Sequence, residues 1–222
     1  MNKLDCVAIF IKYPEEGNVK SRLAKDIGNK NAKNLYIKFV EDIITKLKNM
    51  SFDIQIYYSP EDKEKDIKNW LGNNLNYNVQ VGKDLGEKMT NAFIESFSQY
   101  TNVIIIGSDS PDLSIDILNT GFQNLKNRKS IIGKSRDGGY YLIGFNKNKF
   151  LPDIFKDIKW STETVFDDTM IIFKNNHYNV YSLDEWYDVD NLEDLKYMYY
   201  SNVNTEFNKS KTFNFIKENI NF

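Results

Sequence analysis

The sequence predicts a three-layer α/β/α domain built on a mostly parallel, doubly wound sheet. Short apolar runs alternate with longer segments whose apolar residues recur at helical spacing, which is the pattern of strands joined by crossover helices. The most hydrophobic run, residues 103–107, is apolar throughout, as expected for a central parallel strand covered on both faces. No internal repeat or linker interrupts the pattern. We therefore expect one domain over residues 1–205, followed by a C-terminal tail or docking helix over residues 206–222.

Length and composition are those of a folded protein with one core. The chain has 222 residues, 41% of them hydrophobic and 27% charged, which argues against disorder. The formal net charge is −2 and no basic run stands out, so a nucleic-acid partner is not expected. One cysteine, Cys6, and one histidine, His177, exclude an internal disulfide framework, a cysteine-rich zinc site and paired-histidine metal motifs.

The N-terminal apolar run, residues 4–11, contains Asp5 and precedes no small-residue cleavage site. It is too short for a transmembrane helix and lacks the features of a signal peptide. We therefore expect a cytoplasmic protein without a membrane span. Nothing in the sequence fixes its oligomeric state.

The expected strands and helices alternate along the chain. Alternating or continuous apolar residues predict strands over residues 7–11, 52–58, 77–81, 103–107, 130–133, 140–145 and 179–183. Helical spacing of apolar residues predicts helices over residues 32–47, 61–71, 85–97, 115–125, 163–173 and 191–200. Asp84 and Ser114 are expected to cap two of these helices, and Asp190 with Glu193 forms a capping-box pattern before the last one.

In open α/β sheets, ligands bind at the loops that follow the carboxyl ends of the strands. The first such loop contains Gly17, Lys20 and Arg22. A glycine lets backbone amides approach a phosphate closely, and two cations two residues apart could neutralise its charge. The alternative is an ordinary loop with two solvated cations, because the pattern is neither a Walker loop nor a dinucleotide fingerprint.

The loop after the central strand carries Asp109 and Asp112. Asp109 emerges from rigid backbone, where a carboxylate is well placed to hold Mg²⁺ or Mn²⁺ against phosphate oxygens. Either aspartate could instead make an Asx turn or cap the next helix, and we expect that role for Asp112. Asp188 is a candidate second metal ligand, whereas the capping pattern makes Asp190 the weaker candidate.

Asp137, Gly138, Gly139 and Tyr140 mark a third loop. Two consecutive glycines imply a close approach to the backbone or a positive φ, and Asp137 could orient an acceptor hydroxyl or act as a base. The alternative is a hairpin turn of the Asp-Gly type. The indole of Trp160 either lines the acceptor pocket or belongs to the core.

A glycine-bearing loop follows the third strand. Gln80, Gly82 and Gly86 are candidate contacts for the base or ribose of a nucleotide, but a loop that ends in a helix cap explains them without a ligand, and we favour that interpretation. Cys6 and His177 are assigned to structure, Cys6 because a thiol within a buried strand is inert.

Six motifs occur in order within residues 5–200, and together they resemble one known family. They are Pro14-x-x-Gly17-x-Val19-Lys20-Ser21-Arg22, Asp84-Leu85-Gly86, Gly107-Ser108-Asp109-Ser110-Pro111-Asp112, Asp137-Gly138-Gly139-Tyr140-Tyr141, Trp160-Ser161-Thr162 and Asp188-Val189-Asp190. The combination resembles the glycosyltransferase-A-fold family of radical-SAM/selenodomain-associated transferases. That family belongs to the nucleotide-diphospho-sugar transferase superfamily, whose members include guanylyltransferases of phospholactate and molybdenum-cofactor synthesis.

The resemblance implies a nucleotide bound across the first loop and the sheet edge, with Asp109 where the superfamily holds its divalent metal, Mg²⁺ or Mn²⁺. The implied nucleotide contacts are Gly17, Lys20, Arg22, Gln80, Gly82, Gly86 and Ser108. The implied acceptor contacts are Gly138, Gly139, Tyr140, Trp160 and Ser161.

The chain departs from the family pattern at three places. Ser21 replaces the usual threonine, Lys88 replaces an arginine, and Lys134-Ser135 replaces a Pro-Ala pair. The last change lies just before the third loop and could alter the choice of acceptor.

The residues are compatible with three functions. The first is glycosyl transfer from an NDP-sugar to a small acceptor, with Asp109 on the metal and Asp137 near the acceptor. The second is nucleotidyl transfer from an NTP to a phosphorylated small molecule, with Lys20 and Arg22 stabilising charge on the β- and γ-phosphates. The third is a non-catalytic nucleotide-binding domain. We expect the first, with Asp109, Asp137 and Lys20 as the catalytic residues.

Overall fold

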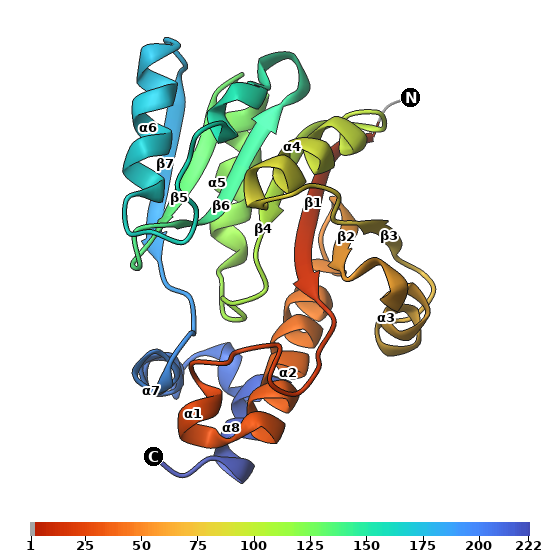
Figure 1. Ribbon diagram of the computed structural model, residues 1–222, viewed down its shortest axis with the longest axis vertical. Coiled ribbons are helices and arrows are strands. Elements are labelled where there is room, and N and C mark those ends of the chain that lie inside the picture. The colour runs from red at the N-terminus through yellow and green to blue at the C-terminus, as the bar shows by residue number, and fades with distance from the viewer. Residues whose placement is uncertain (1–2) are drawn as a thin grey trace.

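The computed structural model describes residues 3–222 and shows a seven-stranded sheet between layers of helices, with strand order β3-β2-β1-β4-β6-β5-β7 (Figure 1). β1 pairs in parallel with β2 and β4, β2 with β3, and β5 with β7, whereas β6 runs antiparallel to both neighbours. The predicted fold class is therefore confirmed. The strands are β1 (Lys3–Lys12), β2 (Asp53–Ser59), β3 (Asn76–Val79), β4 (Tyr100–Ile106), β5 (Ser130–Ser135), β6 (Tyr140–Asn146) and β7 (Val180–Trp186).

Each expected strand and helix has a counterpart, with ends that differ by a few residues. The helices are α1 (Ala24–Ile27), α2 (Asn29–Leu47), α3 (Glu64–Leu71), α4 (Leu85–Ser96), α5 (Ile115–Lys126), α6 (Val165–Asn175), α7 (Leu192–Ser201) and α8 (Lys211–Asn219). The capping residues Asp84 and Ser114 are as predicted, since their side chains accept hydrogen bonds from the backbone of the first turn. The short helix α1 was not expected.

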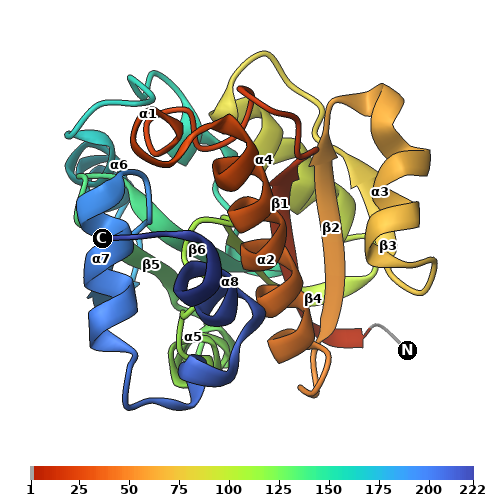
Figure 2. The ribbon, with the colours of Figure 1, turned by 90° about the horizontal axis from the view of Figure 1, so that it is seen from below.

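The two faces of the sheet carry separate apolar cores because successive side chains of a strand point to opposite faces. Val7 and Ile9 of β1 lie in the core beneath α2, α3 and α5. Cys6 and Ala8 lie in the core beneath α4 and α6. Figure 2 shows α2 and α4 on opposite sides of β1. This sandwich holds the strand ends, and hence the loops after them, in fixed positions.

A third apolar cluster lies outside the sheet, on the outer side of α2. Leu35 and Phe39 of α2 pack there with Leu195 of α7 and Ile216 of α8. Both ribbon views show α8 beside α2 (Figures 1 and 2). The segment after residue 205 thus ends in a helix that packs against the domain. None of the helices in residues 3–222 combines the length and apolar character needed to cross a bilayer.

Asp42 of α2 ties α8 in place, and we expect its loss to weaken the fold. Its buried carboxylate accepts hydrogen bonds from the backbone N–H groups of Lys211 (3.1 Å) and Thr212 (2.7 Å) at the start of α8. Asp42→Ala leaves both donors unpaired, which is expected to lower the free energy of unfolding by about 1–3 kcal/mol in urea titrations. Lys211→Ala is the control: it keeps the backbone N–H, removes only the ion pair of the exposed Lys211 ammonium with Glu41 (2.9 Å), and should cost about 0–1 kcal/mol. Equal losses from the two variants would contradict the capping role.

Candidate active site

Loops from several strand ends enclose a cleft at the carboxyl edge of the sheet. Its first compartment has a volume of about 510 Å³ and is formed by the ends of β1 and β2, the loop after β1, and the loops after β3 and β4. Of the residues predicted to bind nucleotide, those that line it are Lys20, Arg22, Gln80 and Ser108. Asp109 and Asp190 close one side.

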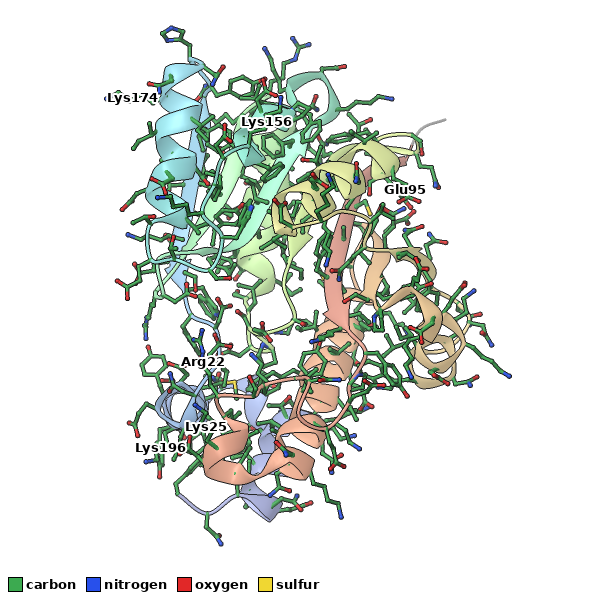
Figure 3. All side chains as sticks on the ribbon, viewed as in Figure 1. Arg22, Lys25, Glu95, Lys156, Lys174 and Lys196 are labelled. Atoms are coloured by element: carbon green, nitrogen blue, oxygen red, sulfur yellow. The ribbon has the colours of Figure 1, made fainter. Side chains whose placement is uncertain are left out.

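A second compartment of about 570 Å³ adjoins the first. It is lined by the turn between β5 and β6, the segment before α6, and the end of the loop after β7. The predicted acceptor residues that line it are Gly139, Tyr140, Trp160 and Ser161, with Asp137 beside them. The two compartments share Arg22, Leu85, Asp109 and Asp190. Arg22 lies between the α1–α7 part of the molecule and the sheet edge (Figure 3).

Lys20 is the charged centre of the junction. Its ammonium lies 2.5 Å from Asp109 Oδ1 and 3.1 Å from Asp190 Oδ1, and the side chain is only 3% exposed. Burial alone would lower the pKa of Lys20, but the charges and hydrogen bonds of the two aspartates outweigh it, so the pKa lies above its ordinary value. The backbone of Lys20 has φ +48°, a conformation that is rare outside glycine.

The capping box predicted for Asp190 and Glu193 is wrong. Asn191 is the N-cap of α7, and its side-chain oxygen accepts from the backbone of Asp194 at 3.0 Å. The carboxylate of Asp194 accepts in return from the backbone N–H of Asn191 (3.1 Å), which completes a box shifted by one residue. Because it is not needed as a cap, the side chain of Asp190 faces Lys20 and lies 3.6 Å from a guanidinium nitrogen of Arg22.

Two serine hydroxyls contact the side chain of Asp188. The Ser135 hydroxyl donates to Asp188 Oδ2 (2.7 Å), and the Ser110 hydroxyl lies 2.8 Å from Oδ1. Burial raises the pKa of Asp188 to about 6, and the charge of Asp109 adds to the rise. The next residue, Val189, donates its backbone N–H to Asp109 O at 2.9 Å. The loops after β4 and β7 are thus joined at the site.

The turn or cap predicted for Asp112 is also corrected. Its carboxylate accepts from the Tyr187 hydroxyl, from Asn202 Nδ2 (2.9 Å) and from the Trp186 indole (3.4 Å). Asp112 therefore joins the loop after β4 to β7 and to the end of α7, a role that sequence spacing does not reveal.

Polar side chains on the inner wall of the first compartment are fixed by backbone contacts. The Tyr36 hydroxyl accepts from the Lys12 backbone (2.9 Å) and lies 3.0 Å from Ser108 Oγ. The Gln80 amide nitrogen donates to Ile11 O and Tyr57 O, each at 2.9 Å. Its amide oxygen has no protein partner among residues 3–222, so it remains able to accept a hydrogen bond from a ligand.

Two glycines set the walls of the second compartment through close backbone packing. Gly138 has φ +88°, and a Cβ there would lie 2.0 Å from Glu163 O. A Cβ on Gly86 would lie 2.8 Å from the Trp160 ring, so the first turn of α4 packs directly on the indole. The hydrogen bond from Gly139 N to Asp137 Oδ1 (2.9 Å) fixes that carboxylate.

Some predicted site residues line neither compartment. They are Gly17, Gly82, Gly86 and Gly138. Position 82 has no room for a side chain, because a Cβ on Gly82 would lie 2.6 Å from Lys88 N. The lining residues that sequence reasoning did not single out include Lys12, Tyr36, Leu85 and Glu163. Tyr36 falls on the apolar face predicted for α2, so the sequence indicates a core residue there. Glu163 directly follows the Trp-Ser-Thr motif, and this position could have indicated its place at the site.

The carboxylates of Asp109 and Asp190 at the junction are ligands of the kind that an oxygen-preferring divalent cation binds. Asp109 and Asp190 are 40% and 35% exposed, and both direct an oxygen at one cation, the Lys20 ammonium. Within residues 3–222, no three acidic, histidine or cysteine side chains already converge around a common metal position. The structure thus shows a cation position shared by two carboxylates, filled by the chain's own lysine.

Comparison with known proteins identifies the family. A family model described as "Uncharacterized protein conserved in bacteria (DUF2064)" matches residues 43–162, more than half of the chain. The chain belongs to this family. It is 38% identical to a candidate nucleotide-diphospho-sugar transferase from Desulfovibrio desulfuricans G20, whose crystal structure superposes with a TM-score of 0.94 over 97% of this chain and 94% of that chain. No curated protein is significantly similar in sequence.

More distant solved structures share the fold. CMP:2-keto-3-deoxy-manno-octonic acid synthetase complexed with CTP is 9% identical, with a TM-score of 0.55 and coverage of 88% and 96% of the two chains. Rv0371c of Mycobacterium tuberculosis H37Rv in complex with manganese is 10% identical, with a TM-score of 0.54 and coverage of 89% and 98%. The predicted resemblance to nucleotide-diphospho-sugar transferases, and the prediction of a transferase-type enzyme, are confirmed at the level of the family.

Proposed function

We propose that the protein is a metal-dependent transferase that moves a glycosyl group from an NDP-sugar to a small acceptor. The observation that carries the proposal is the pair of compartments of similar volume that meet at Asp109, Asp190 and Arg22. A group transfer needs donor and acceptor to touch at the transferred group, and a two-part cleft with charged residues at its junction provides that contact.

The first compartment suits the nucleotide half of the donor. Lys12, Lys20 and Arg22 supply positive charge for a diphosphate. The Gln80 amide oxygen is available to accept a hydrogen bond from a base or ribose, and its donor side is already held by backbone carbonyls. These contacts would hold the diphosphate next to the junction and leave the sugar at the second compartment.

The metal would be held by Asp109 and Asp190, with Asp188 behind them. Mg²⁺ or Mn²⁺ suits carboxylate ligands, and such an ion offsets charge on a leaving diphosphate. The manganese complex of the distantly related Rv0371c supports this choice. Among the protein's own residues, Lys20 and Arg22 stabilise the same negative charge and hold the diphosphate in line.

The proposed transfer balances as a substitution at the anomeric carbon. The acceptor hydroxyl oxygen forms a bond to that carbon, the bond from the carbon to the diphosphate oxygen breaks, and the NDP leaves with the electron pair. The acceptor proton passes to a carboxylate of the second compartment, for which Asp137 is the candidate because a backbone N–H fixes its position.

Nucleotidyl transfer is the second candidate. The three cations of the first compartment also suit a triphosphate, and the fold is shared with a synthetase solved with CTP. In that reaction an acceptor oxygen would bond to the α-phosphorus and pyrophosphate would leave. The products separate the two: NDP is expected from an NDP-sugar, whereas pyrophosphate from an NTP would favour nucleotidyl transfer.

Substitution of Asp109 is expected to remove the metal dependence of donor binding. Calorimetry of wild-type protein with UDP-, GDP- and dTDP-hexoses should show binding that Mg²⁺ or Mn²⁺ strengthens. Asp109→Asn should weaken the metal-supported affinity by about tenfold or more, because a neutral amide is a poor ligand for a hard cation. Asp116→Asn, at an exposed position in the first turn of α5, is the matched control. Metal-dependent affinity that survives in Asp109→Asn would refute the assigned role, and binding without turnover would favour a non-catalytic domain.

A further inference from the structure

The two compartments differ sharply in charge. The first is lined by three cations and two carboxylates, namely Lys12, Lys20, Arg22, Asp109 and Asp190. The second is lined by one cation, Arg22, and by five carboxylates, Asp109, Asp137, Glu163, Asp188 and Asp190. Phosphate therefore belongs in the first compartment, and an anionic group would meet like charge in the second.

Two of the carboxylates that line only the second compartment are not neutralised by ion pairs within the described residues. Asp137 and Glu163 form no ion pair with any residue in the described range 3–222. Lys134, on the preceding strand, lies with its ammonium 5.3 Å from the Phe166 ring centroid and does not line the compartment. Lys156 and Lys174 lie toward the opposite end of the molecule (Figure 3).

Cations at the junction do not change this balance. Lys20, Arg22 and one bound divalent ion supply four positive charges against the five carboxylates, and the donor's diphosphate brings further negative charge. The loaded second compartment thus remains acidic, and most strongly so near Asp137 and Glu163, which lie outside the Lys20 cluster.

Two aromatic side chains, Tyr140 and Trp160, also line the second compartment. Trp160 packs edge-on to Tyr140, with ring centroids 6.3 Å apart and an interplanar angle of 79°, and tilted to Phe155 at 6.5 Å. Gly86 contacts the indole edge, which leaves the ring little freedom to move. A fixed indole in a compartment that is also lined by carboxylates suits an ammonium group as well as the apolar face of a sugar ring.

We infer that the acceptor is a small hydroxyl compound that carries an amino group and no phosphate. Its ammonium would lie between the Glu163 carboxylate and the Trp160 ring, in the field of Asp137, while its hydroxyl reaches Asp137 and the junction. This inference rests on the proposed transfer function and narrows its acceptor class. It also disfavours the phosphorylated acceptors that nucleotidyl transfer would use.

Matched acceptors that differ by one substituent test the inference. D-glucosamine, D-glucose and D-glucose 6-phosphate are compared for binding by saturation-transfer NMR to full-length protein loaded with nucleoside diphosphate and Mg²⁺, and for stimulation of NDP release from NDP-hexoses. The amine is expected to bind best and the phosphate worst, about tenfold apart or more. The inference would be overturned if D-glucose 6-phosphate bound as well as D-glucosamine. It would also be overturned if D-glucosamine bound no better than D-glucose, or did not bind.

Charge variants show whether the named carboxylates cause the preference. Asp137→Asn combined with Glu163→Gln should reduce the gap between amine and phosphate to threefold or less, as a ratio of dissociation constants. Asp167→Asn, an exposed carboxylate in the first turn of α6 outside the compartment, should leave the gap unchanged. Donor binding measured without acceptor is a separate readout: its absence would refute the proposed function, whereas its presence with the wrong acceptor order refutes only this inference.

Discussion

Lys20→Met is expected to lower turnover by about 10²–10³-fold and, at the same time, to strengthen the binding of Mn²⁺ to the nucleotide-free protein. The first effect follows because the variant loses a fixed positive charge next to the developing charge of the leaving group. The second follows because the Lys20 ammonium occupies the position between Asp109 and Asp190, at 2.5 and 3.1 Å, that a metal would have to take. Electron paramagnetic resonance of free Mn²⁺ measures the second effect without any substrate.

The matched control is Lys12→Met. Lys12 lines the same compartment, but its ammonium donates to Asn18 O at 2.9 Å and is not paired with Asp109 or Asp190. Its removal should therefore leave the Mn²⁺ affinity of the nucleotide-free protein unchanged. If Lys20→Met also leaves that affinity unchanged, lysine and metal do not compete for the same oxygens, and the metal lies elsewhere.

Gly138→Ala is expected to lower the free energy of unfolding by about 2–4 kcal/mol, through backbone strain and a steric clash. The native φ of +88° is unfavourable for alanine, and the new Cβ would lie 2.0 Å from the backbone oxygen of Glu163. The segment before α6 would have to move, because its backbone is also tied to Gly138 O by the hydrogen bond from Phe166 N (2.9 Å). Urea unfolding measures the loss, and binding in the second compartment should weaken more than nucleotide binding in the first.

The neighbouring glycine provides the control. A Cβ on Gly139 would approach only the Asp137 side chain, at 3.2 Å, and Gly139 is not among the glycines with positive φ. Gly139→Ala should therefore cost less than about 1 kcal/mol. Similar losses for the two variants would show that the close packing of Gly138 on Glu163 does not hold this part of the fold together.

Much of the fold could be predicted from the sequence because its patterns are strong. The apolar run before Gly107 and the helical spacing in α2 both follow from burial against a sheet, and each led to the right element. Boundaries were less certain where two residues offered the same chemistry. Asp190 and Asn191 are both good caps, and only the path of the chain into α7 decides that Asn191 takes the role.

The site was predictable where residues directly follow strand ends, since chain topology alone brings such loops together. That reasoning located Asp109 and Lys20 near one edge of the sheet, but it could not show that they are ion-paired. It also could not separate glycines that contact a ligand from glycines that let two backbones touch. Gly82 belongs to the second kind, because its neighbours are the backbone atoms of α4.

The hydrogen bond from Val189 N to Asp109 O bears on how the site reaches its active arrangement. It links the backbones that carry the candidate metal ligands, while the serine contacts to Asp188 hold one of those carboxylates in a single orientation. The entropic cost of bringing these carboxylates together is therefore already met when the chain folds. Substrate binding does not have to offset it. The carboxylates are preorganised, and in the proposed reaction the main rearrangement left for the donor would be the movement of the Lys20 side chain from the carboxylates to phosphate.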